Sequence, residues 1–507
     1  MESTLPSHTD VLIVGAGPAG LATAVTLLTA GVKSVVVLDA LEQGQNISRA
    51  VVIHAQTMEE LDTIACAAPM VERGIKASSL LVRTGNTPLL RMNFTLLKNM
   101  TRFPYATLIS QTDTESALED RLNALGGRIL RPVSVTVIAP SSDPGATGIT
   151  ATLADGRTIT ASYVVGADGA RSFVRKAAGI AFRDPKTNED PYAPDADTTS
   201  GWPLIIADVI LSPSAAKYVS ESDLSTLLGP RGFLLLVPLP PLKDDPAQRR
   251  VWRMSCPPEP DNVNPPRLAY LQTILDAALG KRKEKVTVEE VLWSSRFRAR
   301  SAVADSFAAK MGSGTIVLAG DAAHVHSPAG GQGMNLGIRD SIALARALAD
   351  ILGFPTSAPA ASASSAVSTK SSTKAPKIAD GVDARLRAYS DQRRAQAIAV
   401  IKVTKLMTWA TGLKSRPARR VRNAVGWVLG RPKKIEKRMA FRLSGLPAGV
   451  QVASDAGKST NASISGTARG EKTHQPKETS ASLQNGAAAA QNGTGEAEKV
   501  TDTGVQA

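Results

Sequence analysis

The segment from Val11 to Asp39 constrains the fold of this chain more than any other part of the sequence. An apolar run, Val11–Val14, is followed by the glycine-rich stretch 15–20, and a helical pattern of small and apolar residues continues to Gly31. A second apolar run, Val35–Leu38, ends directly before Asp39. Short apolar runs beside turn residues predict buried strands, and the longer segment between them predicts a helix. The order strand, turn, helix, strand predicts a βαβ unit.

The spacing of three glycines in this turn assigns a different task to each. Gly15 allows a tight turn, Gly17 lets a pyrophosphate approach the backbone, and Gly20 lets the helix pack on the strand. The helix N-terminus offers free N–H groups and the positive end of its dipole to phosphates, while Asp39 would accept hydrogen bonds from a ribose diol. This context favours dinucleotide binding over a purely structural turn, although the loop alone does not choose between FAD and NAD. The residues predicted to contact the nucleotide here are Gly15, Gly17, Pro18, Ala19, Gly20 and Asp39.

Composition excludes a disulfide-rich or metal-clustered protein. The 507 residues are 43% hydrophobic, which suffices for two folded domains with appendages. Cys66 and Cys256 provide no disulfide framework and no CxxC or Cys/His cluster, so we expect no bound metal. The start lacks a basic n-region, and Gly and Pro residues interrupt the apolar run 11–32. We therefore expect no signal peptide, no membrane span and a cytoplasmic location.

The formal net charge of +14 is concentrated in residues 402–442, which carry thirteen lysines and arginines against the single acid Glu436. Apolar side chains are interspersed among these cations: Leu406, Met407, Trp409, Leu413, Val425, Trp427 and Leu429. Helices of this kind either pack on their own protein or lie on an anionic membrane. We expect packing on the nucleotide-binding domain, with a weak peripheral membrane contact through 402–442 as the alternative. The segment contains no recognisable nucleic-acid module, so we expect no nucleic acid partner.

A second sheet is predicted from short β-rich runs at 75–93 and 202–256, which Pro, Gly and charged turns separate. The nucleotide-binding pattern resumes at Tyr163 and again at Thr315. The first domain must therefore be discontinuous, with the sheet-rich pieces inserted into it. The Ser, Ala, Thr, Pro and Lys composition of 356–374 predicts a flexible insert, because such a segment buries too little apolar surface to offset its ordering entropy.

Two further motifs each combine an apolar strand with a glycine and an aspartate. The first contains Asp168-Gly169 after Tyr163, and the second contains Gly320-Asp321 after Thr315. Following the glycine loop in this order, they resemble the DG and GD motifs of the para-hydroxybenzoate hydroxylase class of FAD-dependent monooxygenases. The resemblance implies that Asp321 holds a ribityl hydroxyl of FAD, while Asp168 and Gly169 close the fold near the cofactor and the transient nicotinamide route. A carboxylate at the carboxyl end of a strand is well placed to orient a polyol chain.

The resemblance continues along residues 328–335, where glycines would bring backbone N–H groups close to a flat ring. The helix N-terminus that follows would stabilise the negative charge of reduced flavin. The resemblance also assigns Arg49 to the flavin or pyrophosphate and Gln111 to the ribityl chain. The residues assigned to the cofactor in the glycine-rich segment are Pro328, Gly330, Gly331, Gly333, Met334 and Asn335.

His324 and His326 are the first candidates for acid–base chemistry, but we assign neither role to them. Their HxH spacing lacks a third metal ligand, and His324 belongs to the family's GDAAH sequence, where the histidine is mainly structural. We therefore predict a packed histidine. The family's Y-x-x-E-R segment corresponds to residues 389–393, where Gln392 replaces the acid.

The fold implied by the resemblance is α/β, with a Rossmann-type FAD-binding domain, an inserted β-sheet substrate domain and C-terminal helices. The predicted division assigns 1–74, 101–182 and 301–353 to the FAD-binding domain, 75–100 and 183–300 to the substrate domain, 354–381 to a flexible low-complexity insert, 382–447 to a basic helical region and 448–507 to a disordered tail.

The activity implied by the resemblance is hydroxylation of a small aromatic substrate, phenolic or polyketide-like, with NADPH or NADH and O₂ through a flavin C4a-hydroperoxide. The cofactor carries the chemistry, so no residue of the chain is assigned as catalytic. NADPH and NADH are not distinguished, because this class uses no second GxGxxG motif. Two alternatives remain: an epoxidase or ring-expanding oxygenase of a non-aromatic substrate, and a flavoprotein adaptor without turnover.

Overall fold

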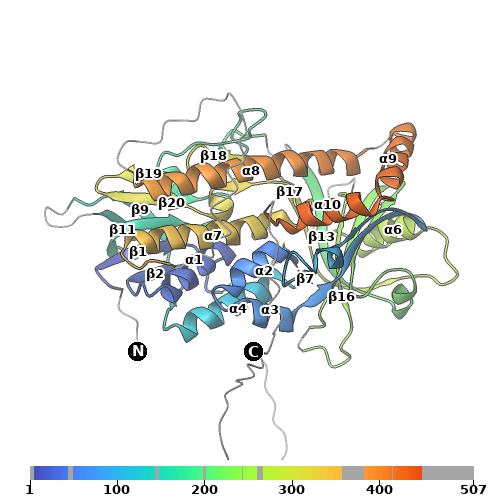
Figure 1. The fold of residues 1–507 in the computed structure, drawn as a ribbon, viewed down its shortest axis with the longest axis horizontal. Helices are drawn as coiled ribbons and strands as arrows, with labels where there is room; N and C mark the ends of the chain where they lie inside the picture. The colour runs from blue at the N-terminus through green and yellow to red at the C-terminus, as the bar shows by residue number, and fades with distance from the viewer. Residues whose placement is uncertain are drawn as a thin grey trace, which may run out of the picture. The chain divides into compact units, whose positions relative to one another are not determined.

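Two large β-sheets, two small ones and the helices packed on them form the regular structure of the described part of the chain (Figure 1). The computed structural model describes residues 5–43, 50–142, 148–197, 201–242, 244–259, 266–356, 382–413 and 415–447.

The first sheet has eight strands in the order β19-β20-β11-β1-β2-β8, with β10 paired to β11 and β9 paired to β10. Strands β20, β11, β1, β2 and β8 run parallel. Val11, Leu12 and Ile13 of β1 are fully buried, as expected for a central parallel strand that is covered on both faces. The strands are β1 (His8–Val14), β2 (Val35–Leu38), β8 (Ile129–Leu130), β9 (Val135–Pro140), β10 (Ile149–Leu153), β11 (Thr158–Gly166), β19 (Ala308–Met311) and β20 (Gly314–Leu318).

Helix α1 (Pro18–Thr29) contacts β1, β2 and two further helices, α4 (Gln111–Ala124) and α7 (Gln332–Ile351). It begins at Pro18, where the fixed φ of proline suits the first turn and the missing N–H costs nothing. All residues of α1 from Gly20 to Leu27 are buried, because these neighbours surround the helix. The predicted βαβ unit is therefore confirmed.

The second sheet has seven strands in the order β17-β13-β16-β15-β14-β5-β6. One face packs on α6 (Leu268–Leu279), where Ile205, Ala207 and Val209 of β13 join one apolar cluster with Leu271. Residues of the other face, such as Val237, belong to the cluster that includes the core of the first sheet. The strands are β5 (Ser79–Thr84), β6 (Thr87–Asn93), β13 (Trp202–Leu211), β14 (Leu224–Gly229), β15 (Gly232–Leu239), β16 (Val251–Cys256) and β17 (Val288–Ala299).

Two three-stranded sheets and several short helices complete the core. The small sheets are β12-β18-β21 and β3-β7-β4. Their strands are β12 (Phe182–Arg183), β18 (Ala302–Ala304), β21 (His324–Val325), β3 (Val52–Ile53), β7 (Ala106–Leu108) and β4 (Ile75–Ala77). The short helices are α2 (Ala55–Asp62), α3 (Ala67–Arg73) and α5 (Phe173–Ala177), with 3-10 turns η1 (Phe94–Leu97), η2 (Pro213–Lys217) and η3 (Gly320–Ala322).

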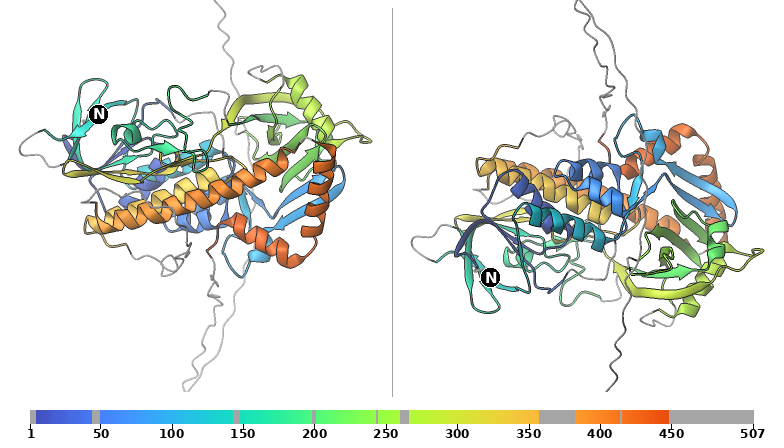
Figure 2. Two further views of the ribbon diagram at one scale, coloured as in Figure 1. Left: turned by 90° about the horizontal axis from the view of Figure 1, so that it is seen from above. Right: turned by 90° about the horizontal axis from the view of Figure 1, so that it is seen from below.

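Three helices follow: α8 (Ala384–Thr411), α9 (Arg416–Leu429) and α10 (Lys433–Ser444). Helix α8 runs beside α7 in every view (Figures 1 and 2). The Tyr389 hydroxyl donates to the Leu318 carbonyl oxygen at 2.8 Å, and Arg393 forms an ion pair with Asp340 of α7. These contacts hold α8 against α7 and the first sheet.

The predicted fold class is confirmed. Strands of the eight-stranded sheet fall within 1–74, 101–182 and 301–353, and those of the seven-stranded sheet within 75–100 and 183–300. These ranges remain our proposal for the domain boundaries. Most of the predicted insert, at 357–381, and the predicted tail, at 448–507, lie outside the described residues. Among the helices of the described ranges, none has the length and apolarity that crossing a membrane requires.

The packing expected for the apolar side chains of 402–442 is wrong for most of them. Five are between 41% and 64% exposed, namely Leu406, Trp409, Val425, Trp427 and Leu429. For the three side chains on α9, the reason is the orientation of this helix, whose Arg419 and Arg422 donate to the carbonyl oxygens of Pro230 and Ala410. Because the polar side of α9 makes these contacts, its apolar side remains exposed.

Candidate active site

The glycine loop and the two aspartate motifs meet at one edge of the eight-stranded sheet. The strands that precede them, β1, β11 and β20, are parallel neighbours, and Val14 pairs in register with Gly166, which pairs with Leu318. The Ala167 N–H donates to the Val14 carbonyl at 2.8 Å, and the Ala319 N–H donates to the Gly166 carbonyl at 3.0 Å. Three segments far apart in the sequence therefore end together, at the edge where α/β sheets bind ligands.

The three glycines of the first loop differ in what surrounds them. Gly15 has φ +102°, and a Cβ there would lie 2.4 Å from the Ala167 carbonyl oxygen. A Cβ on Gly20 would lie 1.8 Å from the Gly15 carbonyl oxygen. Around Gly17, in contrast, no heavy atom lies within 4 Å of the Cβ position. The fold itself requires Gly15 and Gly20, whereas Gly17 borders an open space at the start of α1.

Asp39 braces this loop from the end of β2. Its Oδ2 accepts a hydrogen bond from the Ala16 N–H at 2.6 Å, and its Oδ1 accepts from the Leu41 N–H at 2.9 Å. Each carboxylate oxygen can accept a second hydrogen bond, so these contacts leave acceptor capacity for a ribose. The N-cap of α1, Gly17, contributes no side-chain cap, and the N–H groups in the first turn of α1 have no partner within the helix.

Asp168 caps the short helix α5. Its Oδ2 accepts from the N–H groups of Phe173 at 2.7 Å and Val174 at 3.0 Å. Its Oδ1 is buried and has no hydrogen-bond partner among the described residues. Gly169 has φ +79°, which a residue with a side chain rarely adopts, and no atom lies near its Cβ position. The motif therefore turns the chain sharply and leaves one carboxylate oxygen unused.

Arg175 joins the two aspartate motifs, and the sequence did not indicate this role. It is 2% exposed and donates to the carbonyl oxygens of Ala322 at 2.8 Å and Ala170 at 3.0 Å. Its guanidinium carbon lies 3.8 Å from the centre of the Phe182 ring. No sequence signal separates Arg175 from its neighbour Lys176, because only the tertiary contacts distinguish them.

The second aspartate motif lies against the start of α1. Gly320 has φ +62°, and a Cβ there would lie 2.8 Å from the Cβ of Ala19. The close approach of the two segments therefore requires glycine. Asp321 follows in η3 with its side chain exposed at the same sheet edge. The fold thus presents a carboxylate beside the glycine loop.

Gly330 and Gly331 lead the chain into α7. Both have positive φ, +83° and +63°, and Gly331 is the left-handed N-cap of the helix. Gly333 and Met334 lie in the first turn of α7, where N–H groups have no partner within the helix. Pro328, just before this turn, is exposed. The segment therefore presents a helix N-terminus, and its contact with the flavin ring stays a prediction.

The Asn335 side chain has a structural role, because it forms hydrogen bonds to the protein backbone. Its Oδ1 accepts from the His54 N–H at 2.8 Å, and its Nδ2 donates to the carbonyl oxygens of Val52 at 2.8 Å and Gly331 at 2.6 Å. These bonds fasten the start of α7 to β3. Asn335 is 1% exposed, so it acts on any ligand through the position of the helix.

Two buried histidines flank the same turn. His54 Nε2 donates to the Gly330 carbonyl at 2.8 Å, and His326 Nδ1 donates to the Ser327 carbonyl at 2.9 Å, since a carbonyl only accepts. Burial lowers the pKa of each to about 4. Both imidazoles are therefore neutral near pH 7. The sequence did not indicate His54, because only its contact with Gly330 connects it to the site.

His324 is a packed histidine, as predicted. It is 1% exposed, lies beside Phe307, and places Nε2 2.5 Å from Asp340 Oδ2. The other oxygen of Asp340 pairs with Arg393. Burial alone would raise the pKa of Asp340, but Arg393 and His324 outweigh it and hold this pKa below its usual range. The family pattern has an acid where this chain has Gln392, directly before Arg393. Arg393 is nevertheless paired, because Asp340 of α7 provides its carboxylate partner.

Gln111 lies at the first residue of α4. Its Nε2 donates to Glu115 Oε1 at 2.9 Å, and its Oε1 accepts from the Ala50 N–H at 3.5 Å. This places Gln111 beside the segment that follows Arg49. Arg49 itself lies outside the described residues, so its predicted role remains a prediction.

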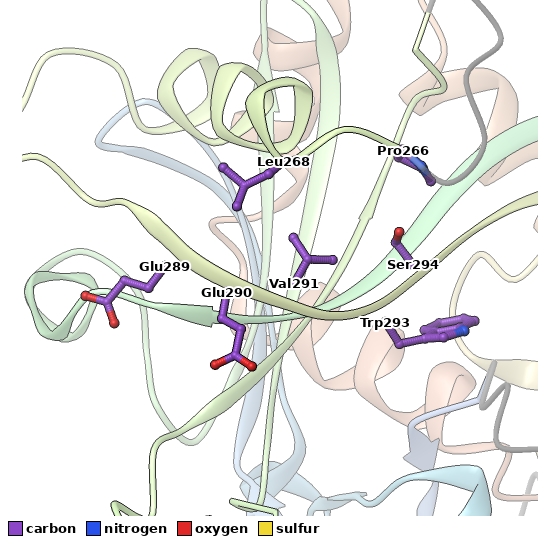
Figure 3. Close-up of a pocket in the computed structure, with 7 residues that line it drawn as sticks. All are labelled: Pro266, Leu268, Glu289, Glu290, Val291, Trp293 and Ser294. Carbon is purple, nitrogen blue, oxygen red and sulfur yellow. The ribbon is translucent and has the colours of Figure 1, made fainter. Parts of the chain in front are cut away.

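The sheet edge fits a dinucleotide better than the open cavity along β17 and α6 does. Figure 3 shows that cavity, of about 590 Å³, with Leu268, Val291 and Trp293 among its lining residues. It lies along β17 and α6 and contains none of the residues predicted to bind the cofactor. The edge, by contrast, combines the open space at Gly17, two helix N-termini and the exposed Asp321.

Sequence comparison finds monooxygenases among the relatives. The chain is 33% identical to 6-methylpretetramide 4-monooxygenase of Streptomyces rimosus over 69% of this chain and 57% of that protein. It is 30% identical to pentachlorophenol 4-monooxygenase of Sphingobium chlorophenolicum over 66% of this chain and 57% of that protein. The chain therefore matches less than two thirds of the length of these curated relatives.

Solved structures share the fold. The p-nitrophenol 4-monooxygenase of Pseudomonas putida superposes with a TM-score of 0.67 at 23% identity, covering 87% of this chain and 99% of that one. The anhydrotetracycline hydroxylase of Streptomyces rimosus gives a TM-score of 0.59 at 26% identity, covering 87% and 76%. The family described as FAD binding domain matches residues 8–355. With its three motifs at one sheet edge, this chain belongs to the FAD binding domain family, and the predicted FAD cofactor is confirmed.

Proposed function

We propose that this protein is an FAD-dependent monooxygenase that hydroxylates a small aromatic substrate, phenolic or polyketide-like, with NAD(P)H and O₂. The observation that carries the proposal is the assembly of the glycine loop and both aspartate motifs at the carboxyl edge of β1, β11 and β20. The names of the relatives, which include 6-methylpretetramide and pentachlorophenol monooxygenases, support the reaction and the substrate class.

The glycine loop would hold the pyrophosphate of FAD. The open space at Gly17 and the N-terminus of α1 suit a phosphate group, because unpaired N–H groups and the helix dipole favour negative charge there. Asp39 would accept from the adenosine ribose. Asp321 and Gln111 would both contact the ribityl chain, and Asp168 and Gly169 would border the nicotinamide route.

The N-terminus of α7 would lie at the flavin ring. When bound, FAD supplies the transfer of one oxygen atom from O₂ to substrate, with NAD(P)H as the reductant. The N–H groups of Gly333 and Met334 and the α7 dipole would stabilise negative charge on the ring. Asn335 would hold this helix end in place through Val52 and His54. Because His54 and His326 are neutral, they would add no positive charge near the ring.

The seven-stranded sheet would serve as the wall of the substrate site. Its face opposite α6 shares a core with the cofactor-binding part, so a substrate held there would lie between the two sheets. Buried Arg253 forms an ion pair with half-buried Asp208 on this face, and its guanidinium carbon lies 5.6 Å from the centre of the Trp293 ring. An aromatic ring beside a fixed polar pair suits a flat substrate that carries hydroxyl groups.

Turnover is the direct test of the proposal. We expect purified protein to be yellow and to release FAD on denaturation, and we expect phenolic or polyketide substrates to stimulate NAD(P)H oxidation. Mass spectrometry should show products that have gained one oxygen atom. Products from alkenes or ketones but not from phenols would instead favour the epoxidase or ring-expanding alternative. FAD binding without substrate-stimulated oxidation over a broad phenol and polyketide panel would indicate an adaptor.

Replacing Asp321 by Ala should weaken FAD binding by about 1.5–3 kcal/mol, because a charge-assisted hydrogen bond to the ribityl chain is lost. The side chain is exposed, so the fold should tolerate the change. Asp155→Ala, in the exposed turn before β11 and therefore at the opposite edge of the sheet, provides a carboxylate control. FAD titration of both apoproteins measures the difference. Equal affinities for the Asp321 variant and the wild type would remove this residue from the site.

A further inference from the structure

Helix α9 turns its polar side toward the protein and its apolar side toward the solvent. Val421, Val425 and Val428 repeat at spacings of four and three residues and therefore lie on one face. Their side chains are 64%, 51% and 58% exposed, and α9 contains no buried residue. A surface helix normally turns its apolar face to the core. Here that face is left to the solvent.

The inward contacts of α9 are polar or made by glycine. Arg419 Nη1 donates to the Pro230 carbonyl at 2.9 Å, and Arg422 Nη1 donates to the Ala410 carbonyl at 3.4 Å. Gly426 and Gly430 lie against Leu89 of β6, where a Cβ on Gly430 would come within 2.2 Å of the Leu89 carbonyl oxygen. Figure 2 shows α9 beside the strands of β5 and β6. The reversed orientation is therefore fixed by specific contacts.

The end of α8 continues this exposed apolar character. Val403, Leu406 and Trp409 repeat every three residues and are 58%, 63% and 64% exposed. The bond from Arg422 to Ala410 joins the end of α8 to α9. We call the following six residues the C-terminal apolar surface: Val403, Leu406, Trp409, Val421, Val425 and Val428. Of the fourteen large apolar side chains that are exposed among the described residues, eight lie between 403 and 429.

Exposed cations lie next to the C-terminal apolar surface along the chain. Arg416 and Arg420 of α9 are exposed, and the Arg431 guanidinium carbon lies 3.4 Å from the centre of the Trp427 ring. Four further cations are exposed on α10, namely Lys433, Lys434, Lys437 and Arg438. The only acid from 402 to 442 is Glu436. A second copy of this chain would bring the same positive charge to the surface, so like-charge repulsion disfavours it as the occupant.

We propose that the C-terminal apolar surface and its cations bind an anionic phospholipid membrane. The apolar side chains would enter the boundary between headgroups and acyl chains, while the lysines and arginines would contact lipid phosphates. Tryptophan is favoured at that depth, because its ring has an apolar body and a polar N–H. The helices would lie on the membrane without crossing it. This inference is independent of the proposed monooxygenase activity.

Co-sedimentation of the full-length FAD-loaded protein with vesicles tests the proposal. We expect binding to vesicles of phosphatidylcholine with phosphatidylserine, little binding to phosphatidylcholine alone, and weaker binding as NaCl shortens the range of the electrostatic attraction. Lys433→Glu/Lys434→Glu should lower the partition coefficient about 30-fold or more, since each cation near an anionic leaflet contributes. Lys33→Glu/Arg128→Glu makes the same change in net charge at exposed positions just before β2 and β8 of the first sheet and should have a much smaller effect.

A second pair of variants tests how much the apolar side chains contribute to membrane binding. Val425→Ser/Val428→Ser should lower binding at least fivefold, whereas Val137→Ser/Leu242→Ser, at similarly exposed positions, should leave it unchanged. FAD content and NAD(P)H oxidation without lipid should be the same in all variants, which separates this test from that of the activity. Equal binding to both vesicle types, or no binding to either, would overturn the proposal. So would a serine double variant that binds like wild type, or a dimer in light scattering that the serine variant abolishes.

Discussion

Replacing Gly17 by Val is expected to give a folded protein that retains no FAD. The backbone of Gly17 has φ −73°, which valine can adopt, and no heavy atom lies within 4 Å of the Cβ position. The valine side chain would occupy only the space that the pyrophosphate needs. We expect FAD affinity to fall by about 3 kcal/mol, roughly a hundredfold.

Two measurements separate binding from folding in this variant. The ratio of flavin to protein absorbance after reconstitution reports the cofactor, and circular dichroism of the apoprotein reports the fold. Gly20→Val is the contrasting control, because its Cβ would lie 1.8 Å from the Gly15 carbonyl oxygen and should prevent folding. A Gly17 variant with full FAD content would show that the loop is structural and that the cofactor lies elsewhere.

Replacing Asp340 by Ala is expected to destabilise the protein by about 3–5 kcal/mol, because Arg393 would remain buried without its counterion. Asp340 is fully buried and pairs with both Arg393 and His324. Asp391→Ala, at an exposed position of α8, should change the free energy of unfolding by less than about 0.5 kcal/mol. Urea unfolding of the FAD-loaded proteins measures both. An unchanged urea midpoint for Asp340→Ala would show that the ion pair of Asp340 and Arg393 contributes nothing to the free energy of unfolding.

The same pair predicts a pH dependence. The pKa of Asp340 is held below its usual range in the folded state. Its ionised form therefore adds to the free energy of unfolding at any pH above the unfolded pKa, and this stabilisation is lost as the pH falls through the folded pKa. The wild type should therefore lose stability on acidification more steeply than Asp340→Ala does. Urea midpoints measured from neutral to acidic pH check this, and parallel curves for the two proteins would contradict it.

The cofactor-binding half of the fold was accessible from the sequence because its determinants are local. In the first forty residues, the two apolar runs, the glycine spacing and Asp39 each specify a strand, a turn or a helix start through neighbours only a few residues away. The Asp168-Gly169 and Gly320-Asp321 motifs are equally local. Their order along the chain also indicated a discontinuous domain, and the strands fall in the predicted ranges.

The sequence by itself therefore determined the βαβ unit, the motifs and the division into two sheets, whereas tertiary packing decided the contacts between them. Nothing in the sequence separates Arg175 from Lys176, but in the structure Arg175 donates to the Ala322 carbonyl. His54 reaches the site only because α7 begins beside β3. The sequence shows the periodicity of α9, but it does not show which face of the helix turns toward the protein. The reason is physical: periodicity reports the two faces of a helix, but the choice between them depends on partners such as Pro230 and Leu89, which lie far away along the chain.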